Sequence, residues 1–210
     1  IENLTINADE RAINIINLPA NVTVNNVTAT AKNNAVMMAT SAAGANLTVN
    51  ESDFTGLAVV NVASENSQVV INNTNITNVD ANEAENYGAI SIFKTASNAT
   101  VVVNGGKVVV NADSKAASIG AADATVTFNG TEGNTEVQTI VAYIGDAGYT
   151  TLKEAIEDAK AGDVVSLIRD ITASNIITIN KAITLDGNGK KLTSTAGRAI
   201  NVDCEGKVAI

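Results

Sequence analysis

The sequence predicts an all-β fold, a parallel β-helix in which coils of three short strands stack on one another. Two short phrases recur in fixed alternation, and successive copies of the first phrase lie 25, 22, 32 and 25 residues apart. These intervals are too long for hairpins and are typical of solenoid coils. Aromatic residues make up only 3% of the 210 residues, and Trp and His are absent. The small and β-branched residues that dominate instead suit thin stacked sheets.

The first phrase consists of an apolar residue, any residue, a second apolar residue and an asparagine. It begins with Val22-Thr23-Val24-Asn25 and predicts one strand of each coil, with both apolar side chains facing inward. Asparagine tolerates the left-handed backbone of a sharp corner, and asparagines stacked from coil to coil can hydrogen-bond to one another. The sequence therefore predicts an asparagine ladder formed by Asn25, Asn50, Asn72, Asn104, Asn129 and Asn180.

The second phrase predicts another strand of each coil, because its apolar residues alternate with period two. Its copies lie at residues 11–15, 35–38, 58–62, 89–92 and 198–202, with a weaker copy at 117–120. The longest coil is expected to accommodate its extra residues in an acidic loop at residues 80–88.

The repeat weakens near Gly130, which predicts three regions. Residues 1–130 are expected to form β-helix coils, residues 131–148 a linker and an entry strand, and residues 149–210 a helical cap followed by the first coils of a β-helix. These first coils could be completed by residues 1–130 of the same copy or of the next one.

One short amphipathic α-helix is predicted at the start of the third region. Its apolar residues follow a helical spacing, Thr151 and Glu154 form a capping box, and Gly162 is expected to end it. The helix residues that carry this prediction are Thr151, Leu152, Glu154, Ala155, Ile156 and Ala159.

The predicted helix is followed by Gly162-Asp163, a strand and the turn Ile183-Thr184-Leu185-Asp186-Gly187. This order of elements resembles the N-terminal cap and first coils of pectate-lyase-like right-handed β-helix proteins. The resemblance implies a right-handed coil, a handedness that parallel crossover connections also prefer. The Asn-, Thr- and Ala-rich repeats further resemble non-enzymatic, adhesin-like cell-surface proteins of bacteria or archaea. In this chain the cap follows five coils instead of preceding them.

Both ends of the chain fall within a phrase, so we expect it to be a piece of a longer protein. Residues 4–6 correspond to a second strand whose coil lacks its first strand, whereas residues 208–210 have the form of a first strand. The ends are therefore predicted to form a continuation interface. It comprises Ile1, Leu4, Ile6, Val208, Ala209 and Ile210. Tandem repetition, head-to-tail stacking of chains and closure within one chain are the three open arrangements.

Composition excludes several functional classes. A formal net charge of −9 argues against a nucleic-acid partner, and no apolar run approaches the roughly 20 residues that span a bilayer. Cys204 stands alone and His is absent, so neither an intrachain disulfide nor a metal site rich in Cys and His is expected. No cofactor is predicted.

The function predicted on these grounds is that of a structural or adhesive module of an extracellular cell-surface protein. Its expected partners are copies of itself and a receptor or glycan on a host or cell surface. The alternative is a polysaccharide lyase or hydrolase of the same fold. Enzymatic activity is not expected, because carboxylates such as Asp113 and Asp123 are isolated, and Arg11 and Arg198 occupy repeat positions.

A lesser alternative is an ice-binding solenoid, suggested by the outward-facing middle residue of each first phrase. That row is mixed rather than uniform, and it consists of Thr23, Thr48, Val70, Val102, Thr127 and Thr178.

Overall fold

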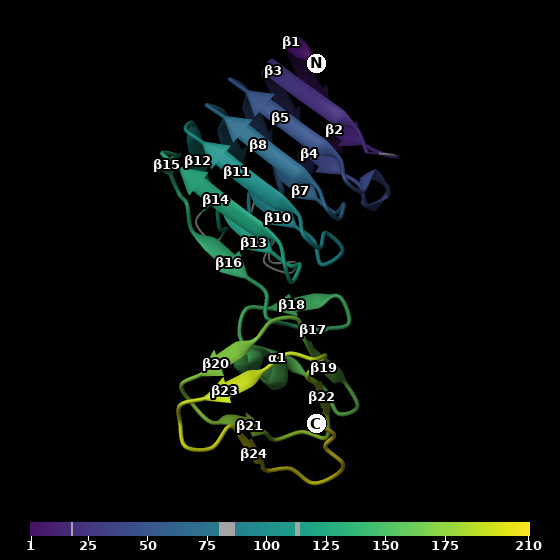
Figure 1. Ribbon diagram of the computed structural model, residues 1–210, viewed down its shortest axis with the longest axis vertical. Coiled ribbons are helices and arrows are strands. Elements are labelled where there is room, and N and C mark those ends of the chain that lie inside the picture. Colours follow the sequence, from purple (N-terminus) through teal and green to yellow (C-terminus); the bar gives the residue numbers. More distant parts are fainter. Residues whose placement is uncertain (18, 80–86, 112–113) are drawn as a thin grey trace. The chain divides into compact units, whose positions relative to one another are not determined.

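The computed structural model describes residues 1–17, 19–79, 87–111 and 114–210, so most of the predicted acidic loop, and Asp113, lie outside the described residues. The chain forms two compact units, Ile1–Gln138 and Thr139–Ile210. Both are built almost entirely of short strands, as predicted (Figure 1).

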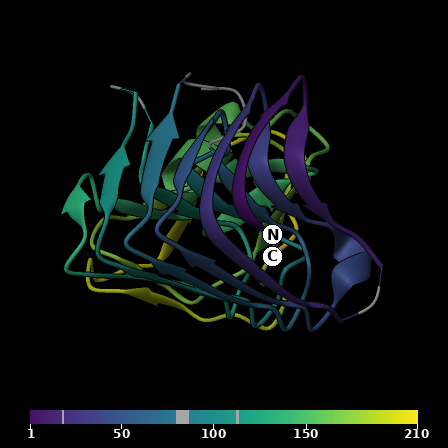
Figure 2. The same ribbon diagram turned by 90° about the horizontal axis from the view of Figure 1, so that it is seen from above.

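The first unit is a parallel β-solenoid with three strand faces. Successive coils lie one above the other, and the strands of each face run side by side (Figures 1 and 2). The first face contains the N-terminal half of β3 (Asn21–Ala31), β5 (Asn46–Asn50), β8 (Gln68–Asn72), β11 (Thr100–Asn104) and β14 (Thr125–Asn129). The second face contains β1 (Glu2–Ala8), the C-terminal half of β3, β6 (Asp53–Gly56), β9 (Asn75–Asn78), β12 (Lys107–Val109) and β15 (Glu132–Gly133).

The third face contains the strands predicted from the second phrase and one further strand at residues 137–139. It consists of β2 (Arg11–Ile15), β4 (Asn34–Met38), β7 (Val60–Val62), β10 (Ile90–Ile92), β13 (Ala117–Ile119) and β16 (Val137–Thr139). A 3-10 helix, η1 (Thr40–Ala42), follows β4. The solenoid thus extends past Gly130, because β15 pairs with β12 within the segment predicted as a linker.

The strand pairing of the first face confirms the strands and the inward-facing residues that the first phrase predicts. Val24 lies beside Val49 and Val49 beside Ile71, and these three side chains are fully buried. Aligned apolar residues from all three faces fill one continuous core. Burial of these side chains is the main source of stability, since each contributes about 1.5–3 kcal/mol of transfer free energy.

The second unit has a small antiparallel entry and two solenoid coils. β17 (Ala142–Ile144) pairs antiparallel with β18 (Ala147–Tyr149) and with β19 (Val164–Leu167). The first coil continues with β20 (Ile171–Ala173) and β21 (Ile177–Ile179), and the second coil consists of β22 (Thr184–Asp186), β23 (Leu192–Ser194) and β24 (Ile200–Val202). Each strand of the first coil pairs in parallel with its equivalent in the second.

This arrangement corrects the assignment of the phrase at residues 177–180. Its strand, β21, is the third strand of its coil and pairs with β24, whereas β19 and β22 are the first strands. An apolar residue on either side of a polar one marks a strand, but it does not say which face the strand belongs to.

The predicted helix is α1 (Leu152–Asp158). The Thr151 hydroxyl accepts the backbone N–H of Glu154 at 3.1 Å, which confirms the N-terminal cap, and Leu152, Ala155 and Ile156 are buried. The helix ends before Gly162, because Ala159 already has an extended backbone. The Lys181 ammonium donates to the carbonyls of Ile156 and Glu157 and so satisfies the last turn.

Candidate functional site

The asparagine ladder runs along the corner between the first and second faces of the first unit. Asn50, Asn72, Asn104 and Asn129 each end a strand of the first face, and Asn25 lies at the equivalent position within β3. The Nδ2 of each later asparagine donates to the Oδ1 of the one before it, at 2.8, 2.8, 3.0 and 2.9 Å in order along the chain. The ladder ties five successive coils together through side chains as well as backbone.

Asn180 lies outside this ladder. It follows β21, a third strand of the second unit, and is exposed. The pairing of Ile179 with Val202 places Asp203, not an asparagine, at the equivalent position of the next coil.

The left-handed corner residue is not the ladder asparagine but the residue after it. Positive φ angles occur at Asn26, Glu51, Asn73, Gly105 and Gly130, each of which directly follows a ladder asparagine. The ladder asparagine can therefore keep its strand conformation, while its neighbour makes the turn. Asn98 and Asn66 occupy another left-handed corner and are themselves joined by a side-chain hydrogen bond of 3.1 Å.

Glu51 is the one corner residue of this set that is neither Asn nor Gly, with φ +49°. We expect Glu51→Asn to stabilise the protein by about 1 kcal/mol, because a left-handed backbone costs an ordinary L-residue roughly that much and Asn less. Chemical denaturation followed by circular dichroism would measure the change. Glu65→Asn, which removes the same charge at an exposed residue without positive φ, should have no comparable effect. Equal shifts in the two variants would contradict the backbone explanation.

The predicted interface residues of the N-terminal coil lie on an open strand edge. Strand β1 pairs only with β3, and β2 only with β4, in the described part of the chain. Leu4 lies beside the fully buried Val27, and Ile6 beside Ala29, so both occupy core rows. Leu4 and Ile1 are nevertheless 50% and 51% exposed, because no other strand of the described residues pairs with β1.

The C-terminal interface residues begin a further coil in the second unit. Ala209 bridges in parallel to Thr184 of β22, and the Leu185 N–H donates to the Ala209 carbonyl at 2.9 Å. Val208 and Ala209 are half-buried, and Ile210 is 73% exposed. Both sets of predicted residues thus lie at coil edges of their own units.

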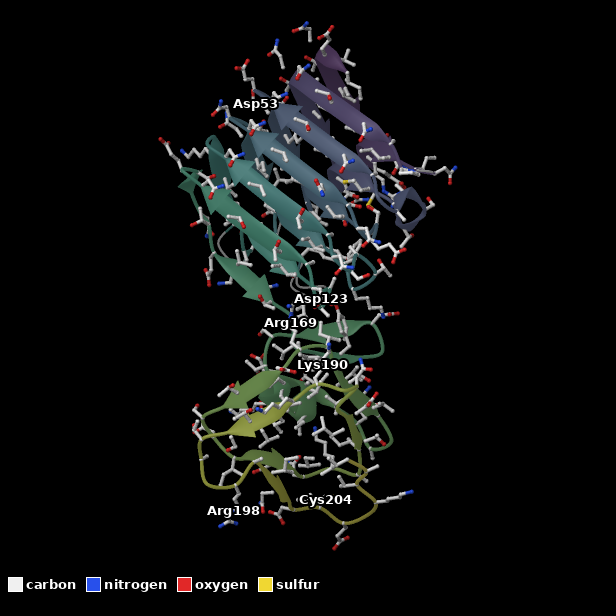
Figure 3. The ribbon with its side chains drawn as sticks, in the orientation of Figure 1. Asp53, Asp123, Arg169, Lys190, Arg198 and Cys204 are labelled. Atoms are coloured by element: carbon white, nitrogen blue, oxygen red, sulfur yellow. The ribbon has the colours of Figure 1, made fainter. Side chains whose placement is uncertain are left out.

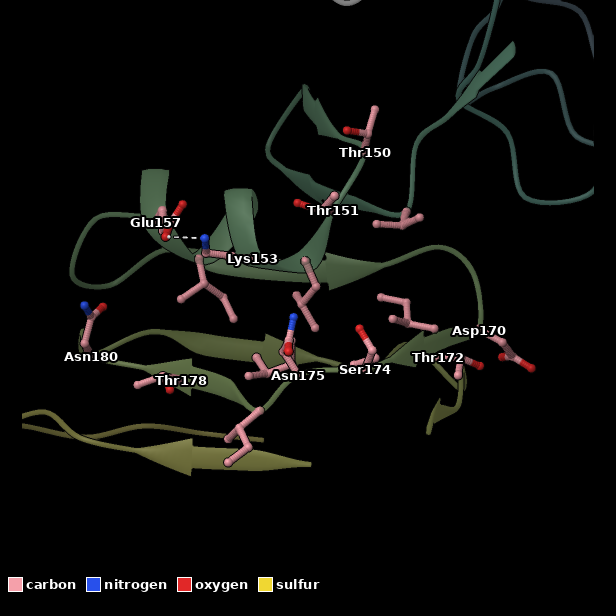
Figure 4. Close-up of a pocket in the computed structure, with 17 residues that line it drawn as sticks. Thr150, Thr151, Lys153, Glu157, Asp170, Thr172, Ser174, Asn175, Thr178 and Asn180 are labelled. Atoms are coloured by element: carbon pink, nitrogen blue, oxygen red, sulfur yellow. Dashed lines mark ion pairs between the residues drawn. The ribbon is translucent and has the colours of Figure 1, made fainter. Parts of the chain in front are cut away.

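A groove of about 620 Å³ in the second unit lies between α1 and residues 170–180 (Figure 4). In the described part of the chain, β20 and β21 each have one strand partner, β23 and β24, and α1 packs against β21. Leu152, Ile156 and Ile177 supply buried apolar lining. The polar lining consists of Thr150, Thr151, Lys153, Glu157, Asp170, Thr172, Ser174, Asn175, Thr178 and Asn180. The helix was predicted from the sequence, but the groove was not. Nothing in the sequence pattern gives the distance between the helix and the strands.

The carboxylates of this groove are engaged in separate contacts. Glu157 forms an ion pair with Lys153 at 3.5 Å, and Asp170 accepts the Lys191 N–H at 2.8 Å. Figure 4 shows Glu157 and Asp170 at opposite ends of the lining. Elsewhere, Asp53 and Asp123 point outward from different coils of the first unit (Figure 3). Within the described ranges, no three His, Cys, Asp or Glu side chains are close enough to share a metal ion.

Two tyrosines of the second unit have perturbed acidities. Burial raises the pKa of Tyr143, partly offset by Arg169 and reinforced by Asp146. Burial also raises the pKa of Tyr149, with a contribution from Asp158 and Asp163. Because the pKa of each phenol is raised, both phenols are protonated and uncharged at neutral pH.

Among the described helices, none has the length and apolar character needed to cross a bilayer. Comparisons with protein-family models, curated proteins and solved structures gave no match. The resemblance to pectate-lyase-like proteins therefore depends on the sequence pattern alone.

Proposed function

We propose that the chain is a non-enzymatic structural and adhesive module of an extracellular cell-surface protein, extended by stacking coil on coil. The observation that carries this proposal is the pair of open coil edges, one in each unit. The N-terminal edge exposes apolar core rows at Leu4 and Ile1, and the other begins a coil at Ala209. Unpaired parallel edges are templates for a further strand.

The two edges supply different strands of a coil, so the edge of one copy could complete the edge of another. The N-terminal coil contributes second- and third-face strands, β1 and β2, without a complete first-face strand, whereas Val208, Ala209 and Ile210 supply a first-face segment. Stacking of one copy on the next would complete the coil and cover the exposed apolar rows. Such a heterologous contact does not close, so it gives a linear array.

The proposal predicts that Leu4→Lys weakens self-association by at least about tenfold, because an ammonium group would enter the core row of the stacked coil. Sedimentation velocity over a range of concentrations would measure it. Thr5→Lys is the matched control, since Thr5 is the exposed neighbour of Leu4 in β1 and lies in the row of exposed Thr28. A wild-type chain that stays monomeric at high concentration, or equal association of the two variants, would contradict stacking.

The groove under α1 is the one observation that favours the polysaccharide alternative. Its hydroxyl and amide lining suits hydrogen bonding to sugar hydroxyls. Acid–base hydrolysis, however, requires two carboxylates flanking one bond, and Glu157 and Asp170 lie at opposite ends of the lining (Figure 4). Glycan binding in an array, without product in a degradation assay, would agree with the proposed adhesive function. Release of product would overturn it.

A further inference from the structure

The chain contains three Asn-Gly pairs, Asn104-Gly105, Asn129-Gly130 and Asn188-Gly189, which the proposed function does not use. An Asn-Gly pair can react with itself. The glycine amide gives its proton to solvent base, and its nitrogen forms a bond to Cγ of the asparagine while ammonia leaves. Water then opens the resulting succinimide at either carbonyl, which gives aspartate or isoaspartate. Glycine favours the reaction because it has no Cβ to obstruct the approach.

The first pair is held in an unreactive arrangement. The Gly105 N–H, the nitrogen that would attack, donates to the Asn129 carbonyl at 2.8 Å. The Asn104 side chain is fixed on both sides, because its Nδ2 donates to Asn72 at 3.0 Å and its Oδ1 accepts from Asn129 at 2.9 Å. All three hydrogen bonds must open before the ring can form.

The second pair lacks most of these restraints. At earlier corners the N–H of the left-handed residue donates to the ladder carbonyl of the next coil, as Glu51 does to Asn72 and Asn73 to Asn104. No further ladder asparagine follows Asn129, and among the described residues no hydrogen bond engages the Gly130 N–H. Asn129 is exposed, and its side chain makes one ladder contact instead of two. A Cβ added at Gly130 would have no atom within 4 Å, so the approach is open.

The third pair has restraints similar to those of the second. The Asn188 N–H is held by the Asp186 carboxylate at 2.9 Å, and its Nδ2 donates to the Leu167 carbonyl at 3.3 Å. The turn is closed by the Lys190 N–H on the Gly187 carbonyl at 2.7 Å. The amide group that must rotate is therefore held by one side-chain hydrogen bond, as that of Asn129 is.

From these contrasts we propose that Asn129 is a site of spontaneous deamidation, located at the last position of the asparagine ladder. Conversion to aspartate replaces the Nδ2 donor with a carboxylate oxygen, so the Oδ1 of Asn104 loses its partner and faces a negative charge. Conversion to isoaspartate also lengthens the main chain where β14 meets its corner. Either product weakens the last coil of the ladder and leaves the earlier hydrogen bonds intact.

Peptide mapping by mass spectrometry of the folded chain, incubated in mildly alkaline buffer, tests this proposal. Deamidation at Asn129 should be at least about tenfold faster than at Asn104, since opening the hydrogen bonds at Asn104 lowers the reactive population by that factor or more. Asn188 should also react faster than Asn104, because its side chain makes one hydrogen bond instead of two. In denaturant all three pairs should react at similar rates, which shows that the folded structure sets the order.

Asn129→Gln is the matched variant, because it keeps the amide but requires a larger ring. It should remove the fast phase and leave the rate at Asn188, which lies in the other unit, unchanged. Equal rates at Asn104 and Asn129 in the folded chain, or an intact Asn129 while Asn188 converts, would overturn the proposal.

Discussion

Gly106→Ala is expected to destabilise the first unit by about 4 kcal/mol or more, which is among the largest losses of stability that single substitutions cause. A Cβ at this position would lie 2.1 Å from the carbonyl oxygen and 2.6 Å from the nitrogen of Thr74. Both are backbone atoms of the adjacent coil, and Thr74 is fully buried. A side chain could swing aside, but a stacked backbone cannot move without breaking the pairing of β9 with β12. The φ of +70° at Gly106 adds strain for any L-residue.

Gly130→Ala is the matched control for this prediction. Its φ is +60°, similar to that of Gly106, but a Cβ there would meet no atom within 4 Å. The control should cost only the backbone strain, about 1 kcal/mol. Denaturation followed by circular dichroism would measure both variants, and hydrogen exchange in β9 and β12 would locate the damage. A similar loss in the two variants would mean that backbone strain, not contact with Thr74, determines the need for glycine.

The first face could be predicted from the sequence almost residue by residue. Its phrase repeats an inward apolar pair and an asparagine, so alignment of the copies gives the pairing of Val22 with Leu47 and of Leu47 with Val69. The apolar face of α1 could be predicted for the same reason, because Leu152, Ala155 and Ile156 follow a helical period and are buried together. In both cases one side of an element faces a core, and burial leaves a pattern in the sequence.

Features without such a pattern were missed. Strand β15 is held only by its pairing with β12, and its residues, Glu132 and Gly133, are exposed, so no alternation marks it. The left-handed corner is occupied by Asn, Glu or Gly in different coils, and the constant residue is the asparagine before it. The groove under α1 depends on a distance between a helix and two strand edges, which no single residue records.

The buried polar groups show a further limit of sequence reasoning. Asn61 lies in the middle of β7, is 4% exposed, and its Oδ1 has no hydrogen-bond partner among the described residues. In the same row of the third face its neighbour Ser91 satisfies its hydroxyl by donating to the Gly88 carbonyl at 3.0 Å. Period two predicts that both side chains point outward, but it does not indicate that the outward side of this face is covered.

The ladder makes the second large prediction, which concerns Asn72 at its centre. Asn72→Ala should cost about 2–3 kcal/mol, because two partners lose their hydrogen bonds at once. The Oδ1 of Asn50 would lose its donor and the Nδ2 of Asn104 its acceptor, at half-buried positions where water replaces them incompletely. The alanine keeps the strand conformation, since the left-handed turn belongs to Asn73.

Asn129→Ala is the comparison for this prediction, because it removes an asparagine from the end of the ladder instead of its centre. Asn129 is exposed and donates to one partner only, so its loss should cost about 0.5–1 kcal/mol. Denaturation midpoints would give the two energies, and hydrogen exchange should show opening in β5 and β11 for Asn72→Ala but only near β14 for Asn129→Ala. If both substitutions cost the same, the number of ladder hydrogen bonds does not determine the cost. A cost at Asn72 about twice that at Asn129 is what independent hydrogen bonds predict. A still larger ratio would mean that the hydrogen bonds strengthen one another along the coils.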